Sequence, residues 1–220
     1  MKLLHVDASP KGERSNSRAL SRHFIASLRA QDVEFEVDYL DLRQHPPAHV
    51  DESFTLAAYT PTAERTEAMN QTLEASNALC RRVLEADALV FAMPMHNFSY
   101  PSVFKAFIDN IIRAELTYVA GESGHYVGQL GRQKVLFIIT RGTDMRAGQP
   151  LSHMDALTPS LNAAFGFIGV QAPTFVNAQP TQFAATQARE EALANARVDL
   201  LNVARDWATQ YKQVQNTVVA

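Results

Sequence analysis

The sequence lacks much of what several large protein classes require. Cys80 is its only cysteine, so no disulfide can form within the chain, which is typical of a reducing compartment. No apolar run is long enough to cross a bilayer, and the first six residues, four of them apolar, are too short for a signal peptide. The net charge of −3 gives no support to a nucleic-acid surface. We therefore expect a cytoplasmic protein that binds neither nucleic acid nor membrane.

Several motifs of catalysis and metal binding are also missing. No G-x-x-x-x-G-K-[ST] loop is present, which disfavours a nucleoside triphosphatase, and no G-x-G-x-x-G marks a separate dinucleotide site. Residues 121–125, GESGH, fail the G-x-S-x-G spacing of a hydrolase. His45 and His49 have the spacing of a helical metal pair, but Pro46 and Pro47 between them disfavour a helix. We do not expect a zinc site.

Short apolar runs that alternate with helical patterns indicate the fold class. Residues 89–92 and 135–139 are continuous apolar runs, typical of strands buried on both faces. Residues 3–6 predict a first strand and residues 171–178 a last one. Residues 34–40 alternate between polar and apolar side chains, which predicts an exposed strand at the edge of the sheet. Five strands alternating with helices predict an α/β fold whose parallel sheet is covered on both faces.

The segments between the strands show the spacing of amphipathic helices. The clearest stripe is near the C-terminus and contains Leu193, Ala196, Leu200, Val203 and Trp207. Further helices are expected after residue 17, over 53–59 and 62–86, from Pro101, and over 151–167. Cys80 lies on one face of the helix at 62–86 with other apolar residues, which predicts a packing role and not a reactive thiol.

Two further expectations concern the organisation of the chain. Residues 117–130 carry aromatic arms on both sides of a glycine-containing turn, which predicts a hairpin. There is no internal repeat, low-complexity tract or long linker, so residues 1–220 are expected to form a single domain.

Three polar loops follow strands that such a sheet would place side by side. In a sheet of strand order 2-1-3-4-5, the first, third and fourth strands are adjacent, and ligands bind outside their carboxyl ends where the order reverses. The loops lie at residues 9–17 (SPKGERSNS), 95–98 (MHNF) and 140–143 (TRGT). The first combines serine hydroxyls with the start of a helix, which suits a phosphate group. In the second, Asn97 can donate to and accept from the edge of a heteroaromatic ring.

Each loop also has a simpler interpretation when it is taken alone. The serines can be cap and turn residues, the 94–101 segment a rigid crossover turn, and Gly142 a feature of an ordinary strand end. The expected meeting of all three loops in one cleft is what favours a ligand site.

The loop sequences resemble one family. SPKGERSNS at 9–17, PMHNFSYPSVFKAFID at 94–109 and TRGT at 140–143 look like the FMN-dependent NADH:quinone oxidoreductases, or azoreductases, of flavodoxin-like fold. NIIRAELTY at 110–118 and TPSLNAAFGFIG at 158–169 are further matches, so the resemblance covers nearly the whole chain. It implies bound FMN, with NADH or NADPH as co-substrate. It also implies a ping-pong cycle of two-electron reduction of quinones and reductive cleavage of azo compounds.

The resemblance also implies roles for individual residues. The residues implied at the FMN phosphate are Ser9, Ser15, Asn16 and Ser17. Those implied around the isoalloxazine are Met95, His96, Asn97 and Phe98. Those implied on its pyrimidine side are Thr140, Arg141, Gly142 and Thr143. A homodimer is implied, with each FMN near the interface, and we expect Tyr59 and Tyr118 to cover the ring from the partner and to line the substrate pocket.

The chain departs from the family pattern at two places. His96 stands where the family usually has Tyr, and TRGT replaces the usual Ser-Arg-Gly-Gly. His96 could tune the charge of the reduced flavin or protonate a substrate, because histidine titrates near neutral pH, or it could simply replace a packing tyrosine. Thr143 could shift its loop, because only glycine tolerates positive φ freely.

Two related functions stay open at this point. One is a flavodoxin-like electron carrier or flavin-storage protein, and the other is a reductase that releases reduced FMN. The additional segments at 43–59 and 117–130 favour an enzyme, because a carrier does not need a substrate pocket. A purely structural α/β protein would leave the three polar loops unexplained.

Overall fold

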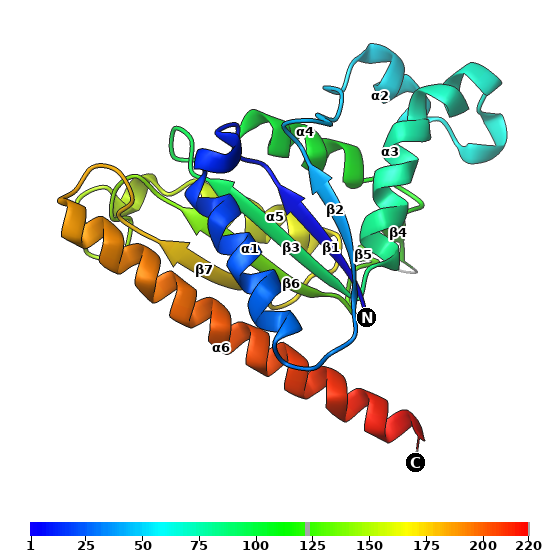
Figure 1. Cartoon of the computed structure of the whole chain (residues 1–220). Coiled ribbons are helices and arrows are strands. Elements are labelled where there is room, and N and C mark those ends of the chain that lie inside the picture. Colours follow the sequence, from blue (N-terminus) through cyan, green and yellow to red (C-terminus); the bar gives the residue numbers. More distant parts are fainter. Residues whose placement is uncertain (122–123, 220) are drawn as a thin grey trace.

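A computed structural model describes residues 1–121 and 124–219 of the chain, and it is built around one parallel sheet (Figure 1). Its five strands are β1 (Lys2–Asp7), β2 (Glu36–Asp41), β3 (Ala88–Pro94), β6 (Lys134–Thr140) and β7 (Thr174–Ala178). They are ordered β2-β1-β3-β6-β7, and each neighbouring pair is parallel. This is the expected order 2-1-3-4-5, so the fold prediction is confirmed.

The apolar runs occupy the middle of the sheet. Residues 88–93 of β3 and 135–140 of β6 are buried throughout, as expected for strands covered on both faces. The alternating segment forms β2 at the edge, also as expected, although its pairing begins at Glu36 and not at residue 34. The reversal of strand order falls between β1 and β3, so the loops after these strands open at the same edge of the sheet.

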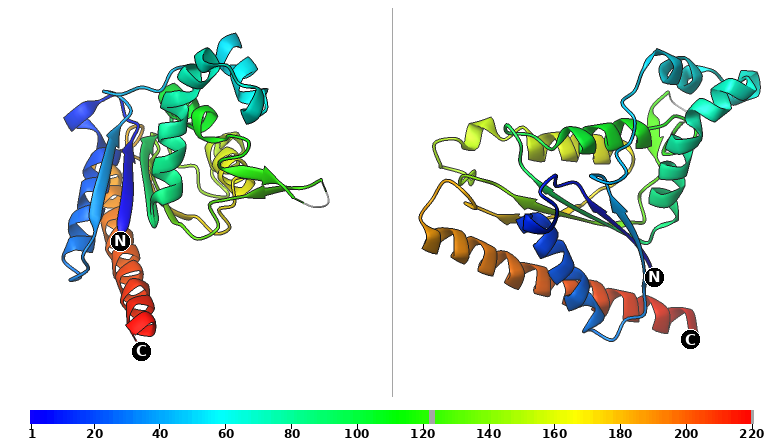
Figure 2. Two further views of the ribbon diagram at one scale, coloured as in Figure 1. Left: turned by 90° about the vertical axis from the view of Figure 1, so that its right-hand side faces the viewer. Right: turned by 45° about the horizontal axis from the view of Figure 1, so that its top comes forward.

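Helices cover both faces of the sheet (Figure 2). One face packs against α1 (Asn16–Arg29) and α6 (Thr186–Val219), and the other against α3 (Glu67–Glu85), α4 (Ser102–Ile111) and α5 (Leu157–Phe167). On the second face the core is aromatic: the Phe91 ring packs within 6 Å of the rings of Phe104, Phe107, Phe137 and Phe165. On the first face, Phe24 of α1 meets Trp207 of α6 edge to face, with ring centroids 5.3 Å apart.

Two expected helices begin later in the structure than in the sequence interpretation. Residues 62–64 form a short 3-10 turn, and α3 starts after Thr66, whose hydroxyl accepts from the Met69 N–H at 3.3 Å. Residues 152–154 form another 3-10 turn, and α5 starts only at Leu157. In both cases a polar side chain just before the helix satisfies its first N–H groups and fixes where it begins.

The segments outside the sheet follow the remaining expectations. The short helix α2 is present as Glu52–Tyr59, and β4 (Tyr118–Ala120) pairs with β5 (Tyr126–Gly128) as the expected antiparallel hairpin, of which residues 122–123 lie outside the described part. Cys80 is fully buried, and burial raises the pKa of its thiol to about 11, so its packing role is confirmed. Within the described ranges, no helix combines the length and apolar character needed to cross a bilayer.

Candidate functional site

The loop after β1 presents hydroxyl and N–H groups at the start of α1. Ser15 is the N-cap of α1: its Oγ accepts from the Arg18 N–H at 3.3 Å and lies 3.1 Å from Ser17 Oγ. Within the described residues, the N–H groups of Asn16 and Ser17 donate to no backbone carbonyl. The first turn of a helix leaves such donors free, and with the positive end of the helix dipole they attract an anion.

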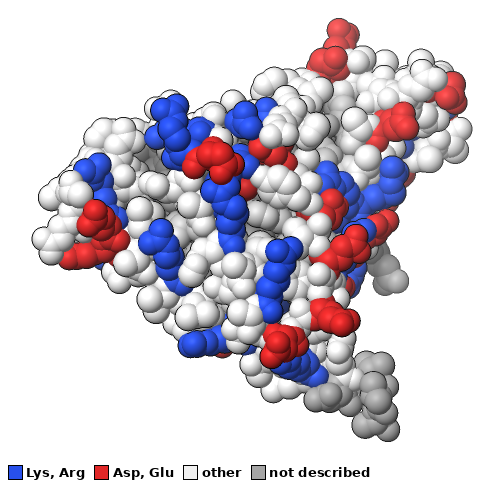
Figure 3. Space-filling model, in the orientation of Figure 1, with Lys and Arg blue, Asp and Glu red and all other residues white. Residues whose placement is uncertain are grey.

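Two cationic side chains stand beside this loop. Lys11 and Arg14 line the same cleft as Ser9 and Ser15, and neither forms an ion pair with any described residue. Figure 3 shows Lys and Arg side chains gathered on the surface around the start of α1. Free cations next to free N–H donors give this end of the cleft the chemistry of a phosphate site.

The loop after β3 is a tight turn with an unusual backbone. Asn97 and Phe98 have φ angles of 47° and 70°, and His96 and Ser99 exchange backbone hydrogen bonds of 2.8 and 2.9 Å. Asn tolerates this left-handed region, but Phe is strained there, and such strain concentrates at functional sites. Neighbouring segments hold the turn: the Met95 N–H donates to Thr140 O at 2.8 Å, and the Ala156 N–H donates to Phe98 O at 3.1 Å.

The structure brings seven of the expected residues into one cleft of about 300 Å³. They are Ser9, Ser15, Asn16, Met95, His96, Thr140 and Gly142, from the loops after β1, β3 and β6. The volume is at the lower end of the range for small-molecule sites. The three loops therefore meet as the strand order requires, although they are far apart in the sequence.

Five expected residues do not line this cleft. Ser17 is buried behind Ser15, and Asn97 lines a shallow neighbouring cavity that also includes His96. Phe98 and Thr143 line none of the cavities found next to the cleft. Thr143 does not have a positive φ, so replacing glycine at this position does not strain the backbone.

The fifth, Arg141, is 2% exposed, and its side chain turns away from the cleft. Its guanidinium donates to Asp155 Oδ2 at 3.0 Å and to Thr158 Oγ1 at 2.6 Å, and it also contacts Asn177 Oδ1. The same aspartate accepts from the N–H groups of Leu157 and Thr158 at 3.0 and 3.1 Å. Arg141 therefore ties the end of β6 to β7 and to the start of α5, and only its backbone faces the loops of the cleft.

One wall of the cleft was not expected from the sequence. Thr181 and Gln182, in the loop after β7, line it together with Pro94. Their N–H groups donate to the carbonyls of Arg141 and Gly142 at 2.8 and 3.0 Å. A Cβ on Gly142 would lie 2.9 Å from the Phe183 ring, so this loop packs directly on the glycine. Thr181 and Gln182 could have been predicted only from the position of their loop, because β7 ends at the same edge of the sheet as β6.

The charge state of His96 follows from its surroundings. Burial, and then the nearby charge of Lys11, lower the pKa of His96 below its ordinary value. The imidazole is therefore neutral at pH 7, where it can donate or accept a hydrogen bond but carries no charge.

Tyr59 and Tyr118 lie together, but in a different cavity. This cavity, of about 400 Å³, is also lined by Phe54 and Arg113, which sits over the Phe54 ring at 5.3 Å from its centroid. The Tyr118 ring packs against those of Tyr126 and Phe167, with centroids 5.3 and 4.8 Å apart. In one chain, neither tyrosine reaches the serine-lined cleft.

Comparison with known proteins places the chain in a family. A family model described as a flavodoxin-like fold matches residues 1–203. An FMN-dependent NADH:quinone oxidoreductase of Trichormus variabilis is 39% identical over 207 residues, 94% of this chain and 97% of that protein. The chain belongs to the FMN-dependent NADH:quinone oxidoreductase family. Another of these oxidoreductases, from Polaromonas naphthalenivorans, is 35% identical over 217 residues, 97% of this chain and 98% of that protein.

Solved structures support the fold of this oxidoreductase family member. An azoreductase of Bacillus anthracis matches with a TM-score of 0.85 at 23% identity, covering 94% of this chain and 99% of that one. A B. anthracis FMN-dependent NADH-azoreductase in complex with FMN matches with a TM-score of 0.83 at 24% identity, covering 94% and 100%. At such identities the likeness shows the fold, whereas family membership makes the chain an oxidoreductase.

Proposed function

We propose that residues 1–220 act as one FMN-binding domain that uses NADH or NADPH to reduce quinones and to cleave azo compounds. The observation that carries the proposal is the composition of the cleft. Lys11 and Arg14, which form no ion pair with any described residue, lie beside the free N–H groups at the start of α1, and Met95 and His96 line the same cleft. This donor set fits a phosphate monoester at one end and a flat ring at the other. The proposal extends to this chain what the names of its relatives say of them.

The residues of the cleft divide into three groups by the part of FMN that they would hold. The residues that would hold the phosphate are Ser9, Ser15, Asn16 and Ser17, and Ser17 supports Ser15 from behind. The residues that would surround the isoalloxazine ring are Met95, His96, Asn97 and Phe98. The group on the pyrimidine side includes Thr140 to Thr143, where Gly142 allows close approach and Arg141 fixes the loop through its buried side chain.

Bound FMN supplies the redox chemistry, because its ring accepts a hydride and returns two electrons. The chain supplies position and polarity. The nicotinamide and the electron acceptor would use the same opening in turn, since no separate dinucleotide motif is present, and this is the ping-pong order that the resemblance implies. A cytoplasmic location, where these reductants are available, is part of the proposal.

We assign His96 to hydrogen bonding at the mouth of the cleft and not to acid catalysis at neutral pH, because its pKa is lowered. A His96→Tyr variant, with the residue that the family usually carries, should keep the pH dependence of kcat above pH 7. A loss of activity on the alkaline side in the wild type alone would contradict this assignment.

We also propose that two copies complete the substrate pocket. The Tyr59 side chain is 79% exposed, Tyr126 62% and Phe167 42%, and the ring contacts from Tyr118 to Tyr126 and Phe167 make an aromatic surface. Exposed aromatic patches of this kind mark interfaces, and a symmetric pair would bring the surface of one copy towards the cleft of the other. Sedimentation should show a dimer, and a fully active monomer would contradict the proposal.

The visible absorption spectrum, recorded without oxygen before and after one equivalent of NADH, tests the whole proposal. A flavin spectrum that bleaches with NADH, in a protein that keeps its flavin through desalting, is the expected result. Retention through turnover also separates the enzyme from a reductase that releases reduced FMN. A flavin that ignores both NADH and NADPH would indicate a carrier or storage protein, and a protein that takes up no FMN would refute the cleft assignment.

A further inference from the structure

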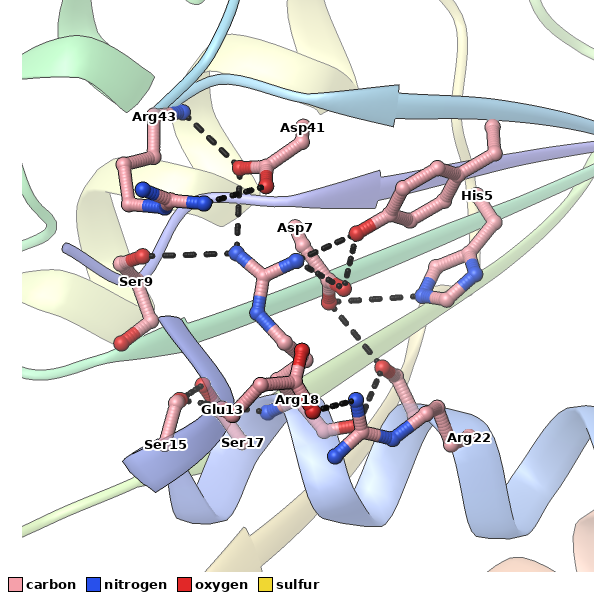
Figure 4. A network of polar contacts seen from close by, with 12 residues as sticks. His5, Asp7, Ser9, Glu13, Ser15, Ser17, Arg18, Arg22, Asp41 and Arg43 are labelled. Carbon is pink, nitrogen blue, oxygen red and sulfur yellow. Dashed lines mark hydrogen bonds and ion pairs between the residues drawn. The ribbon is translucent and has the colours of Figure 1, made fainter. Parts of the chain in front are cut away.

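A buried network of charged side chains lies behind the phosphate end of the cleft (Figure 4). At its centre is Arg18, in the first turn of α1 and 4% exposed. Its guanidinium lies 3.2 Å from Asp7 Oδ2 and 3.0 Å from Asp41 Oδ1, the aspartates that end β1 and β2. It also contacts the Tyr39 hydroxyl, which donates to Asp7 at 2.9 Å.

Arg18 also bonds to the loop at residues 9–15, once through its side chain and once through its backbone. Its guanidinium donates to Ser9 O at 3.5 Å, at the beginning of the loop. Its backbone N–H donates to Ser15 Oγ, the N-cap at the end of the loop. One residue is thus bonded to both ends of the segment that carries Lys11 and Arg14, and to the ends of two strands. The position of the start of the loop relative to the sheet therefore depends on the Arg18 guanidinium, whereas the bond to Ser15 comes from the backbone.

The same guanidinium neutralises negative charge close to the proposed phosphate site. Asp7 and Asp41 are 1% and 4% exposed, and Asp7 lies only two residues before Ser9. Both buried carboxylates face the Arg18 guanidinium. Asp41 also pairs with the half-exposed Arg43, at 3.7 Å, whereas Ser21 and His5 contact only Asp7 of the two. Without Arg18, Asp7 would lose its arginine partner and Asp41 would keep only the half-exposed Arg43, so negative charge behind the loop would oppose a bound dianion.

We propose that Arg18 is a positioning residue for the phosphate group of the cofactor: it fixes the loop at 9–15 against the ends of β1 and β2 and compensates Asp7 and Asp41. Arg18 does not line the cleft, whereas residues of the loop do. The inference rests on the proposed function, because it takes the ligand to be a flavin mononucleotide. It goes beyond that function by assigning phosphate affinity to a side chain outside the site.

The test compares binding of FMN with binding of riboflavin, which has the same ring and no phosphate. Dissociation constants are measured by quenching of flavin fluorescence for the wild type and for Arg18→Met. The wild type should bind FMN more tightly. The variant should lose about tenfold or more of its FMN affinity, because a displaced loop would weaken the charge-assisted hydrogen bonds of its own residues to the phosphate, with little change for riboflavin.

Arg22→Met is the matched control. Arg22 lies one turn further along α1 and carries the same charge, and among the described residues its only ion pair is with Glu13 of the loop, an exposed and screened pair at 2.6 Å. It should keep the wild-type ratio of FMN to riboflavin affinity, which separates positioning by Arg18 from a general effect of charge. If Arg18→Met fails to fold, Arg18→Lys carries the test, because lysine keeps the charge but cannot bond to both aspartates at once, and it should reduce the ratio of FMN to riboflavin affinity by less than tenfold.

The outcomes distinguish this inference from the proposed function. An equal loss of FMN and riboflavin affinity in the Arg18 variants would mean that Arg18 only stabilises the fold, and an unchanged ratio would mean that it does not position the loop. Either result overturns the inference while wild-type FMN binding leaves the proposed function intact. If the wild type binds neither flavin, the proposed function itself has failed.

Discussion

Two buried arginines flank the cleft, and they are held in different ways. Arg18 stands between β1 and β2 and faces two carboxylates, whereas Arg141 stands at the end of β6 and faces one carboxylate, one amide and one hydroxyl. Burial alone would lower the pKa of both guanidinium groups. With Asp41 and Asp7 the pKa of Arg18 is nevertheless raised, while Asp155 does not prevent the pKa of Arg141 from being lowered.

The difference shows what each network contributes to the cleft. Around Arg18 two buried aspartates face one buried arginine, and the second positive charge comes from the half-exposed Arg43, 3.7 Å from Asp41, so Asp7 depends on Arg18 for its arginine partner. Around Arg141 a neutral pair is completed by uncharged groups, and the pair joins three elements, β6, β7 and α5. We therefore expect Arg141 to matter mainly for stability and Arg18 mainly for the charge near the ligand.

The largest expected effect comes from Arg141→Met. Breaking a buried ion pair on one side leaves Asp155 and Asn177 without their partner and typically costs about 3–5 kcal/mol. Because Asp155 is partly exposed and keeps its bonds to the start of α5, we expect a loss at the lower end, about 3 kcal/mol. Urea unfolding followed by circular dichroism measures this loss in the free energy of unfolding. A loss below about 1 kcal/mol, as for an exposed ion pair, would show that the Arg141 network does not stabilise the fold.

Tyr39→Phe should have an intermediate effect that depends on pH. Burial alone would raise the pKa of Asp7, but His5, Arg18 and the Tyr39 hydroxyl hold it below its ordinary value of 3.8. Asp7 therefore contributes stability that is fully present above pH 3.8 and is lost as the pH falls through its folded pKa. Removing the hydroxyl should cost about 1–2 kcal/mol at pH 7 and move acid unfolding to higher pH.

Acid titration of the wild type and Tyr39→Phe by circular dichroism checks this expectation. The difference in stability between the two proteins should shrink below pH 3.8, where Asp7 becomes protonated and the hydroxyl no longer serves a carboxylate. A difference that stays constant down to the acid transition would show that Tyr39 acts through packing alone.

The smallest effects are expected for arginines in exposed pairs. Arg146 pairs with Asp144 near the β6 loop and Arg22 with Glu13 near the β1 loop, at 2.5 and 2.6 Å, with arginine side chains 66% and 50% exposed. Solvent screens such pairs, so Arg146→Met and Arg22→Met should leave the urea midpoint unchanged within error. A large shift of the urea midpoint in either variant would mean that the burial of an arginine does not determine how much it stabilises this protein.

The sequence was most informative where burial leaves a periodic signal. The apolar runs of β3 and β6, the alternation in β2 and the stripe of α6 predicted the strands, the edge position of β2 and the last helix, because two-sided, one-sided and helical burial each have their own spacing. The full strand order was expected from the doubly wound, flavodoxin-like fold that the loops resemble. The meeting of the three polar loops followed from the order of the strands. Helix starts were less predictable, because a single capping side chain such as Thr66 decides them.

The sequence was least informative about side-chain direction and long-range partners. Arg141 sits in a loop expected to face the ligand, yet its guanidinium turns inward to Asp155 and Asn177, whose nearness no local pattern indicates. For the same reason, the contribution of Thr181 and Gln182 was missed. Arg18 resembled any other polar residue of an amphipathic helix, because its partners at 7 and 41 are brought to it only by the paired strands.

The packing of the first helix against the last has a consequence for biosynthesis. α1 is made well before α6, but the cluster that holds Leu20, Phe24 and Leu28 is completed by Leu200 and Trp207 of α6 together with residues of the sheet. A ribosome must therefore translate α6 before this face can be fully buried. Until then the growing chain presents a partly uncovered apolar helix, a surface of the kind that chaperones bind, and a chain that stops before α6 should aggregate and not form a smaller enzyme.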